Sequence, residues 1–213
     1  MILLGVLTVI AMSASNPEML LVLAKAGDGE ALGRLLERHR GYLILLARMQ
    51  LGRLLRGKID AEDILQETSL EAHRGIARFR GTSEAAFRSW LRQILAAVLS
   101  NQVRRYRGTK GRDARLERRL LDDLDRSSRA LDRGLVAEQS SPSQQVARRE
   151  RALLLAEALS LLPDDYRDVI VLRHLEGLGF AEVADRMGRT EDSVKNLWVR
   201  ALARLRRTLD DPR

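Results

Sequence analysis

Helical spacing of its apolar residues is the feature of this sequence that most restricts the fold. In residues 32–49, LGRLLERHRGYLILLARM, leucine and alanine recur every three or four positions along one broad stripe. Such a stripe is typical of a buried helix. No segment shows the alternating β-branched pattern of a strand, and the helix-favouring residues Leu, Ala, Arg and Glu dominate the composition. The sequence therefore predicts an all-α fold.

A chain of 213 residues can form one domain or two small ones, each with a modest hydrophobic core. Over residues 113–145, mixed charges, a Ser-Ser pair, a glycine and the run SSPS interrupt the helical pattern, which indicates a flexible linker with transient helix. We therefore expect two small helical domains. The predicted parts are an uncertain N-terminal extension over 1–18, a first domain over 19–112, the linker over 113–145 and a second domain over 146–213.

The opening stretch MILLGVLTVIAM is apolar but too short to span a bilayer. No positive charge precedes it and no convincing cleavage site follows, so it makes a poor secretory signal. Met12 or Met19 is an alternative first residue. The absence of Cys rules out disulfides and thiolate metal sites, and it fits a reducing compartment. We expect a cytoplasmic protein without membrane insertion.

The formal net charge of +8 favours a polyanionic partner, either nucleic acid or an anionic membrane surface. The alternative is a basic surface that is merely solvated. Three scattered His residues, the lack of Cys and the lack of a phosphate-cradling glycine loop argue against a zinc site or a P-loop. We therefore expect no cofactor, no metal and no catalytic residue.

The last predicted helix contains TEDSVKNLWVRALARLR, residues 190–206. Val194, Trp198, Ala201 and Leu205 fall on one stripe, so Trp198 is predicted to anchor the helix to its own domain. The short predicted helix FAEVADRM and the turn GRT precede it, which together describe a helix-turn-helix. In that motif the second helix enters the major groove of DNA.

The face opposite Trp198 carries side chains that can read bases or hold phosphates. Arg can read guanine, Asn adenine, and Glu can accept from cytosine. The alternative is a plain helical bundle with a solvated basic face. The candidate DNA contacts are Thr190, Glu191, Ser193, Lys195, Asn196, Arg200 and Arg204.

A helix is also predicted after Asp60, which stands where an N-cap belongs. Its core side carries Leu65 and Ala72. Acidic residues follow a second side at Asp63 and Glu67, so this helix has an acidic face separate from its core face.

Two stretches of the chain, in this order, resemble a known family. DAEDILQETSLEAHRGIARFRG, followed by FRSWLRQI and a basic cluster, resembles region 2 of the extracytoplasmic-function (ECF) group of bacterial RNA polymerase sigma factors. LLPDDYRDVIVLRHLEGLGFAEVADRMGRTEDSVKNLWVRALARLRR resembles region 4. The resemblance implies a protein that binds core RNA polymerase, directs it to a promoter and helps open the duplex.

The resemblance also implies roles for particular residues. The last helix would read the upstream promoter element, the −35 element. The segment that docks on the clamp helices of the largest polymerase subunit matches Asp60, Asp63, Gln66 and Glu67. Other family positions capture the unpaired strand near the start site, at the −10 element. The residues at the corresponding place in this sequence are Arg78, Arg80, Thr82, Ser83, Arg104, Arg105 and Arg107. Further partners in the family are the upstream-facing flap of the polymerase and, often, an anti-sigma factor.

The sequence departs from the family pattern at three positions of the second stretch. Leu197 stands where Arg is usual and Val199 where His is usual, so one family DNA contact is expected to be missing. Gly179 stands where a Ser or Thr cap is common, which predicts a weaker helix start.

The alternative function is that of a stand-alone helix-turn-helix transcription regulator. Its C-terminal domain would look like residues 150–209, and it would bind DNA without polymerase. A protein of membrane surfaces is a more distant alternative, supported only by the charge and the apolar start. The match of residues 60–107 to a polymerase-docking region favours the sigma factor.

Overall fold

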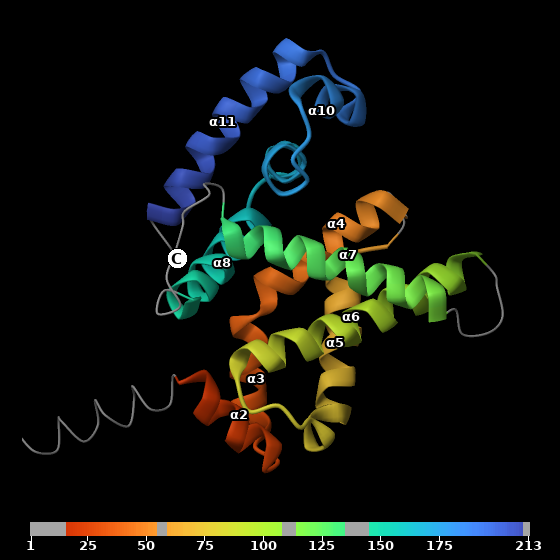
Figure 1. Ribbon diagram of the computed structural model, residues 1–213, viewed down its shortest axis with the longest axis vertical. Coiled ribbons are helices and arrows are strands. Elements are labelled where there is room, and N and C mark those ends of the chain that lie inside the picture. Colours follow the sequence, from red (N-terminus) through yellow and green to blue (C-terminus); the bar gives the residue numbers. More distant parts are fainter. Residues whose placement is uncertain (1–15, 55–58, 108–113, 135–144, 211–213) are drawn as a thin grey trace, which may run out of the picture. The chain divides into compact units, whose positions relative to one another are not determined.

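The computed structural model of the protein describes residues 16–54, 59–107, 114–134 and 145–210 (Figure 1). All regular structure within these ranges is helical, which confirms the predicted all-α fold. Residues 1–15 of the predicted extension and 135–144 of the predicted linker lie outside the described residues. The elements are α2 (Pro17–Lys25), α3 (Gly29–Arg38), α4 (Arg40–Leu54), α5 (Ala61–Gly75), η1 (Ile76–Arg78), α6 (Glu84–Arg107), α7 (Ala114–Arg133), α8 (Gln145–Ser160), α9 (Asp164–Ile170), η3 (Val171–Leu175), α10 (Phe180–Met187) and α11 (Glu191–Asp210).

The chain divides into two compact units. The first draws on residues 1–40 and 57–121, and the second on residues 41–56 and 122–213. Helix α4 therefore falls almost wholly in the second unit, and α7 contributes to both. The functional division into domains predicted from the sequence stays a prediction.

The first unit is built around α6, whose buried residues follow a strict four-residue spacing. Phe87, Leu91, Leu95 and Leu99 are all fully buried along one side of this helix. Residues four apart lie one above the other on a helix, so this spacing makes a continuous apolar ridge. Helix α5 packs against α6, and α2 packs against α3 and the 3-10 turn η1.

Side-chain caps start two helices of the first unit, and the cap at Asp60 lies where the sequence predicts it. The Asp60 carboxylate accepts from the Glu62 N–H at 3.0 Å at the start of α5, as expected. The Ser83 hydroxyl accepts from the Ala86 N–H at 3.2 Å at the start of α6. Each cap satisfies one backbone donor that the first turn of a helix leaves without an intrahelical partner.

Helix α7 occupies much of the stretch that the sequence predicts to be a linker. Leu120, Leu124 and Leu131 are buried on one side of it, and Ser127 and Ser128 are buried too. A Ser-Ser pair is common in loops, but small side chains also fit a tightly packed helix face. Residues 114–133 therefore form a packed amphipathic helix although their composition is typical of a loop.

In the second unit, three helices pack against the buried side of α11. Helix α11 packs against α8, α9 and α10, and Figure 1 shows α10 close to the N-terminal end of α11. Pro163 precedes α9, which continues directly into the π-helical turn η3. Single π turns are often found at functional positions.

Candidate nucleic-acid and polymerase interfaces

A tight turn joins α10 to α11 and forms the predicted helix-turn-helix. Gly188 has a φ of 64°, a left-handed conformation that ends α10. The Arg189 N–H then donates to the Ala184 carbonyl at 3.0 Å. The Thr190 hydroxyl accepts from the Ser193 N–H at 3.3 Å, so Thr190 caps α11. The Thr190 hydroxyl therefore already accepts a hydrogen bond within the protein itself.

The start of α10 is firmer than its glycine predicts. Gly179 has no side chain to cap the helix, but the Glu182 carboxylate accepts from the Gly179 N–H at 2.8 Å. This bond is one half of a capping box, supplied from the third residue of the helix. The prediction of a weaker start for α10 did not take this Glu182 hydrogen bond into account.

Four residues of α11 are buried and fix which side of the helix faces its own unit. They are Val194, Leu197, Ala201 and Leu205. Trp198 lies at the edge of this buried side and is half-buried. Its indole Nε1–H donates to His174 Nε2 at 2.9 Å, and its ring meets Phe180 edge-on with centroids 5.5 Å apart. Trp198 is thus an anchor, as predicted, but one that keeps part of its indole exposed.

His174, on the π turn η3, must be unprotonated at Nε2 to accept this hydrogen bond. Burial, and secondarily the positive charge of Arg173, lower the pKa of His174 below its ordinary value. The indole and imidazole rings are nearly parallel, with centroids 6.0 Å apart. Sequence analysis did not foresee this partner because 24 residues separate the pair.

The exposed side of α11 carries the predicted reading face. Thr190, Glu191, Lys195, Asn196, Arg200 and Arg204 are exposed, and Ser193 is half-buried. Lys195 Nζ lies 2.7 Å from a carboxylate oxygen of Glu191, one turn earlier. The hydrogen bond and negative charge of Glu191 raise the pKa of Lys195, which keeps the ammonium group charged. The Arg200 Nε donates to the Asn196 carbonyl at 3.2 Å.

Arg189, in the turn between α10 and α11, forms an ion pair with α9. Its guanidinium lies 2.5 Å from a carboxylate oxygen of Asp165 at the start of α9. Sequence analysis missed this residue as well, because nothing near Arg189 in the chain marks Asp165 as its partner. The pair connects the turn that positions α11 to the helix beneath it.

The acidic face of α5 is present, but its four predicted residues are not equivalent. Asp63 and Gln66 are exposed. Asp60 is occupied as the N-cap, and Glu67 is half-buried and accepts from the Gln102 amide of α6 at 2.7 Å. Asp63 and Gln66 are therefore the two members presented most openly.

The segment between η1 and α6, residues 79–83, is held down by its own small core. The Phe79 ring lies 4.9 Å from Trp90 and 6.0 Å from Phe87, centroid to centroid. Gly81 covers Phe79 so closely that an added Cβ would lie 2.2 Å from Phe79 Cζ. Lys25 of α2 donates to the Gly81 carbonyl at 3.1 Å. Because the resemblance predicts that this segment helps to capture promoter DNA, we call residues 79–83 the promoter loop.

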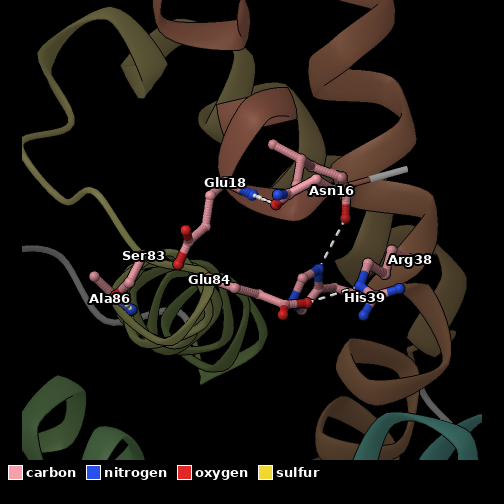
Figure 2. A network of polar contacts seen from close by, with 8 residues as sticks. Asn16, Glu18, Arg38, His39, Ser83, Glu84 and Ala86 are labelled. Atoms are coloured by element: carbon pink, nitrogen blue, oxygen red, sulfur yellow. Dashed lines mark hydrogen bonds and ion pairs between the residues drawn. The ribbon is translucent and has the colours of Figure 1, made fainter. Parts of the chain in front are cut away.

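The N-terminal turn of α6 is tied to the end of α3 beside this loop (Figure 2). A Glu84 carboxylate oxygen accepts from Arg38 Nε at 2.7 Å and lies 3.6 Å from His39 Nε2. His39 is fully buried, and its Nδ1 pairs with the Leu35 carbonyl at 2.8 Å. Burial lowers the pKa of His39, with nearby Arg88 acting in the same direction. Burial therefore favours the neutral form of His39 in the folded protein.

The residues predicted to hold the unpaired strand fall into two separate places, the loop before α6 and the basic end of α6. Arg78, Arg80 and Thr82 are exposed in or beside the promoter loop, and Ser83 is half-buried there. Arg104 is half-buried and Arg105 exposed near the other end of α6, while the side chain of Arg107 lies outside the described part. About 20 helical residues separate the groups, or roughly 30 Å. One nucleotide cannot contact both.

Aromatic side chains near these two groups differ in exposure. Phe79 and Trp90 are half-buried in the small core described above. Tyr106, beside Arg105, is 50% exposed. Tyr106 is therefore the more open of these three rings.

Within the ranges that the structure covers, no helix has both the length and the apolar character needed to cross a membrane. The same ranges contain no cluster of three or more His, Cys, Asp or Glu able to hold a metal ion.

Comparison with known proteins identifies both stretches singled out in the sequence. The Sigma-70 region 2 family matches residues 35–109, and the Sigma-70, region 4 family matches residues 152–205. The chain is 31% identical over 195 residues to the ECF RNA polymerase sigma factor SigM of Mycobacterium tuberculosis (strain Erdman), covering 92% of this chain and 85% of SigM.

Two further relatives agree. The chain is 29% identical over 188 residues to the ECF RNA polymerase sigma factor BldN of Streptomyces coelicolor, covering 88% of this chain and 64% of BldN. It is 28% identical over 176 residues to the ECF RNA polymerase sigma-E factor of Haemophilus influenzae, covering 82% of this chain and 85% of that factor. The resemblance noted from the sequence is thereby confirmed. The chain belongs to the ECF RNA polymerase sigma factors, which bind core RNA polymerase and direct transcription initiation at specific promoters.

Proposed function

We propose that three surfaces of this sigma factor divide the work of initiation. The exposed side of α11 reads the upstream −35 element as duplex. The promoter loop and the basic end of α6 hold the unpaired strand at the −10 element. The acidic face of α5 docks on the clamp helices of the largest polymerase subunit. In this role the protein works in the cytoplasm as a binding subunit, and the polymerase supplies the catalysis.

The observation that carries the proposal is the division of α11 into two faces. Its buried residues leave Asn196 and Arg200 exposed next to Lys195 on the other side. Asn and Arg are the side chains that recognise adenine and guanine edges in the major groove. Lys195 and Arg204 supply charge for phosphates, which positions a protein on DNA without reading sequence. A short preceding helix and a tight turn complete the geometry of a groove-reading helix.

The promoter loop supports a role in strand capture by its mixture of fixed and exposed groups. Lys25 and the Phe79 cluster hold its backbone, while Arg80 and Thr82 remain exposed. A held backbone with exposed cationic and hydroxyl groups suits a single strand, because less ordering is required on binding. Ser83 already caps α6, so Thr82 is the hydroxyl that we assign to DNA.

The basic end of α6 is assigned a second, separate stretch of the same strand. Arg105 is exposed there, next to Tyr106. A cationic side chain beside an aromatic ring is the combination that binds phosphate and base together. The distance along α6 requires this stretch to be several nucleotides from the one at the promoter loop.

The acidic face of α5 supports docking on a basic partner surface. Asp63 and Gln66 present a carboxylate and an amide one turn apart, and Gln102 holds Glu67 in place. Complementary charge across an interface speeds association and suppresses wrong partners.

Run-off transcription from a randomised promoter library tests the proposal directly. Bacterial core RNA polymerase would be used with and without the protein. We expect transcripts only when the protein is present, from templates that share two motifs at a fixed spacing. A fixed spacing is expected because two small contacts on one polymerase-bound protein must be engaged together.

Specific binding of the isolated protein to one duplex site, without any protein-dependent transcripts, would contradict the proposal. It would favour a stand-alone regulator instead.

A further inference from the structure

One apolar side chain stands in the middle of the reading face of α11. Val199 is 58% exposed. It follows Lys195 by four residues and Asn196 by three, and the exposed Ala203 follows it by four. Positions three and four apart are neighbours on a helix surface, so Val199 lies between the polar groups assigned to DNA.

The fold of the protein makes little use of this side chain. The buried side of α11 is already complete, with Val194, Leu197, Ala201 and Leu205 against the second unit. Val also has a lower helix propensity than Lys, Arg or Glu, so local stability does not favour it at an exposed position. Single exposed apolar residues are common, and exposure alone assigns no role. The position of Val199 among base-reading groups is the observation that matters.

We infer that Val199 contacts the 5-methyl group of a thymine in the upstream element, an inference that rests on the proposed function of α11. The thymine methyl is the apolar group that base pairs present in the major groove, and apolar side chains recognise it. Asn196 and Val199, as neighbours on the helix, would meet neighbouring base edges. Val199 thus contributes preference for thymine at one position, while Lys195 and Arg204 contribute affinity for any sequence.

Replacement of thymine by deoxyuridine tests this contact, because it removes the methyl group and leaves base pairing intact. Promoter duplexes from the library selection would carry deoxyuridine at each upstream thymine in turn. Binding of the complete holoenzyme, core RNA polymerase with this protein, would be measured at fixed salt. Loss of one buried methyl contact predicts about three- to fivefold weaker binding at one thymine.

The Val199→Ala variant makes the test specific to the side chain. It should bind the thymine duplex about three- to fivefold more weakly and lose no further affinity when that thymine becomes deoxyuridine. Sensitivity at other positions should persist. Val22→Ala is the matched control: Val22 is 64% exposed on α2, so its removal should leave every deoxyuridine effect unchanged.

Two results overturn the inference. One is a holoenzyme that tolerates deoxyuridine at every upstream position, or whose selected upstream element contains no thymine. The other is a Val199→Ala variant with undiminished deoxyuridine sensitivity.

Asn196→Ala and Arg200→Ala distinguish this failure from failure of the proposed function. If both variants bind the upstream element normally, α11 is not the reading helix. If both weaken binding while deoxyuridine has no effect, the reading helix stands and only the methyl contact is refuted.

Discussion

The Trp198 indole donates a 2.9 Å hydrogen bond to His174 Nε2 and so joins α11 to the π turn η3. The bond lies where the buried side of α11 meets its exposed side. Because both partners are only half-buried, part of their contribution to stability is screened by solvent.

Removing this hydrogen bond should destabilise the second unit measurably. We expect Trp198→Phe and His174→Leu each to lower the free energy of unfolding by about 1 kcal/mol. The double variant should lose less than the sum, because the same bond is removed twice. Urea unfolding followed by circular dichroism measures all three. Trp90→Phe is the control, because Trp90 has a different set of contacts: its loss in free energy of unfolding should add to that of His174→Leu. Strict additivity between Trp198→Phe and His174→Leu would mean that the bond contributes nothing.

Acidification should weaken the fold through two histidines. The folded-state pKa values of His39 and His174 both lie below the ordinary value of 6.5, chiefly because of burial. The unfolded chain therefore binds protons first as the pH falls. Stability should be full above about pH 6.5 and should decline below it.

Melting temperatures between about pH 7.5 and 5.5 would show this decline. The pH dependence should flatten in His39→Gln, even if that variant is less stable at every pH. His73 is exposed on α5, so His73→Gln serves as the control and should keep the wild-type slope.

Charge reversal at Asp63 should abolish binding to core RNA polymerase. The Asp63→Arg side chain would face a basic partner surface with the wrong sign, while its exposure leaves the fold intact. Pull-down of core enzyme measures the loss. Glu30→Arg is a matched control, because Glu30 is an exposed acid in the first turn of α3 and the change in net charge is the same. Equal binding by both variants would show that the acidic face is only solvated.

Arg200→Ala should weaken holoenzyme binding to the upstream element and alter its salt dependence. Loss of a phosphate contact would make the slope of log affinity against log salt shallower by about one. Loss of a guanine contact would instead relax sequence preference at one position. Arg34→Ala on α3 should do neither. An unchanged affinity throughout a salt titration would remove Arg200 from the DNA face.

A side chain at Gly81 should impair promoter opening. The Cβ of Gly81→Ala would lie 2.2 Å from Phe79 Cζ and 2.8 Å from Ala86 Cβ, so the promoter loop must shift. We expect closed complexes to form normally while permanganate reactivity of the melted strand falls.

Gly33→Ala is the matched control for that substitution. No atom lies within 4 Å of the corresponding Cβ position on α3. The change should raise stability by about 0.5–1 kcal/mol and leave opening unaffected. Normal opening by Gly81→Ala would mean that the loop conformation is unimportant.

Structural features that depend on neighbouring residues in the sequence were predictable, and contacts between residues far apart in the sequence were not. The Asp60 cap and the buried stripe of α11 follow from neighbouring residues, since helical spacing and capping are short-range. The Lys25 bond to the Gly81 carbonyl joins residues 56 apart and leaves no mark in the local pattern. The pairing of Trp198 with His174 is of the same kind.

The extent of helix α7 could not be predicted from composition. Residues 113–145 were predicted as a linker with transient helix, but Ser127 and Ser128, which are common in loops, are buried on a helix. The predicted strand-binding residues already form two groups in the sequence, one in the loop and one in the basic cluster that ends the following helix. The length of α6 separates Thr82 from Arg105, because a straight helix carries its two ends apart.

The ion pair between Lys195 and Glu191 gives the reading face an internal counter-ion. A polyanion that attracts Lys195 must also approach the carboxylate of Glu191. The negative charge of Glu191 therefore weakens non-specific electrostatic attraction to DNA at this point of the helix. Under the proposed function, a correct site would replace the pair by offering a phosphate to Lys195 and a cytosine amino group to Glu191. An internal counter-ion of this kind would favour selectivity over non-specific binding, so that a strongly basic protein is not held at every wrong sequence.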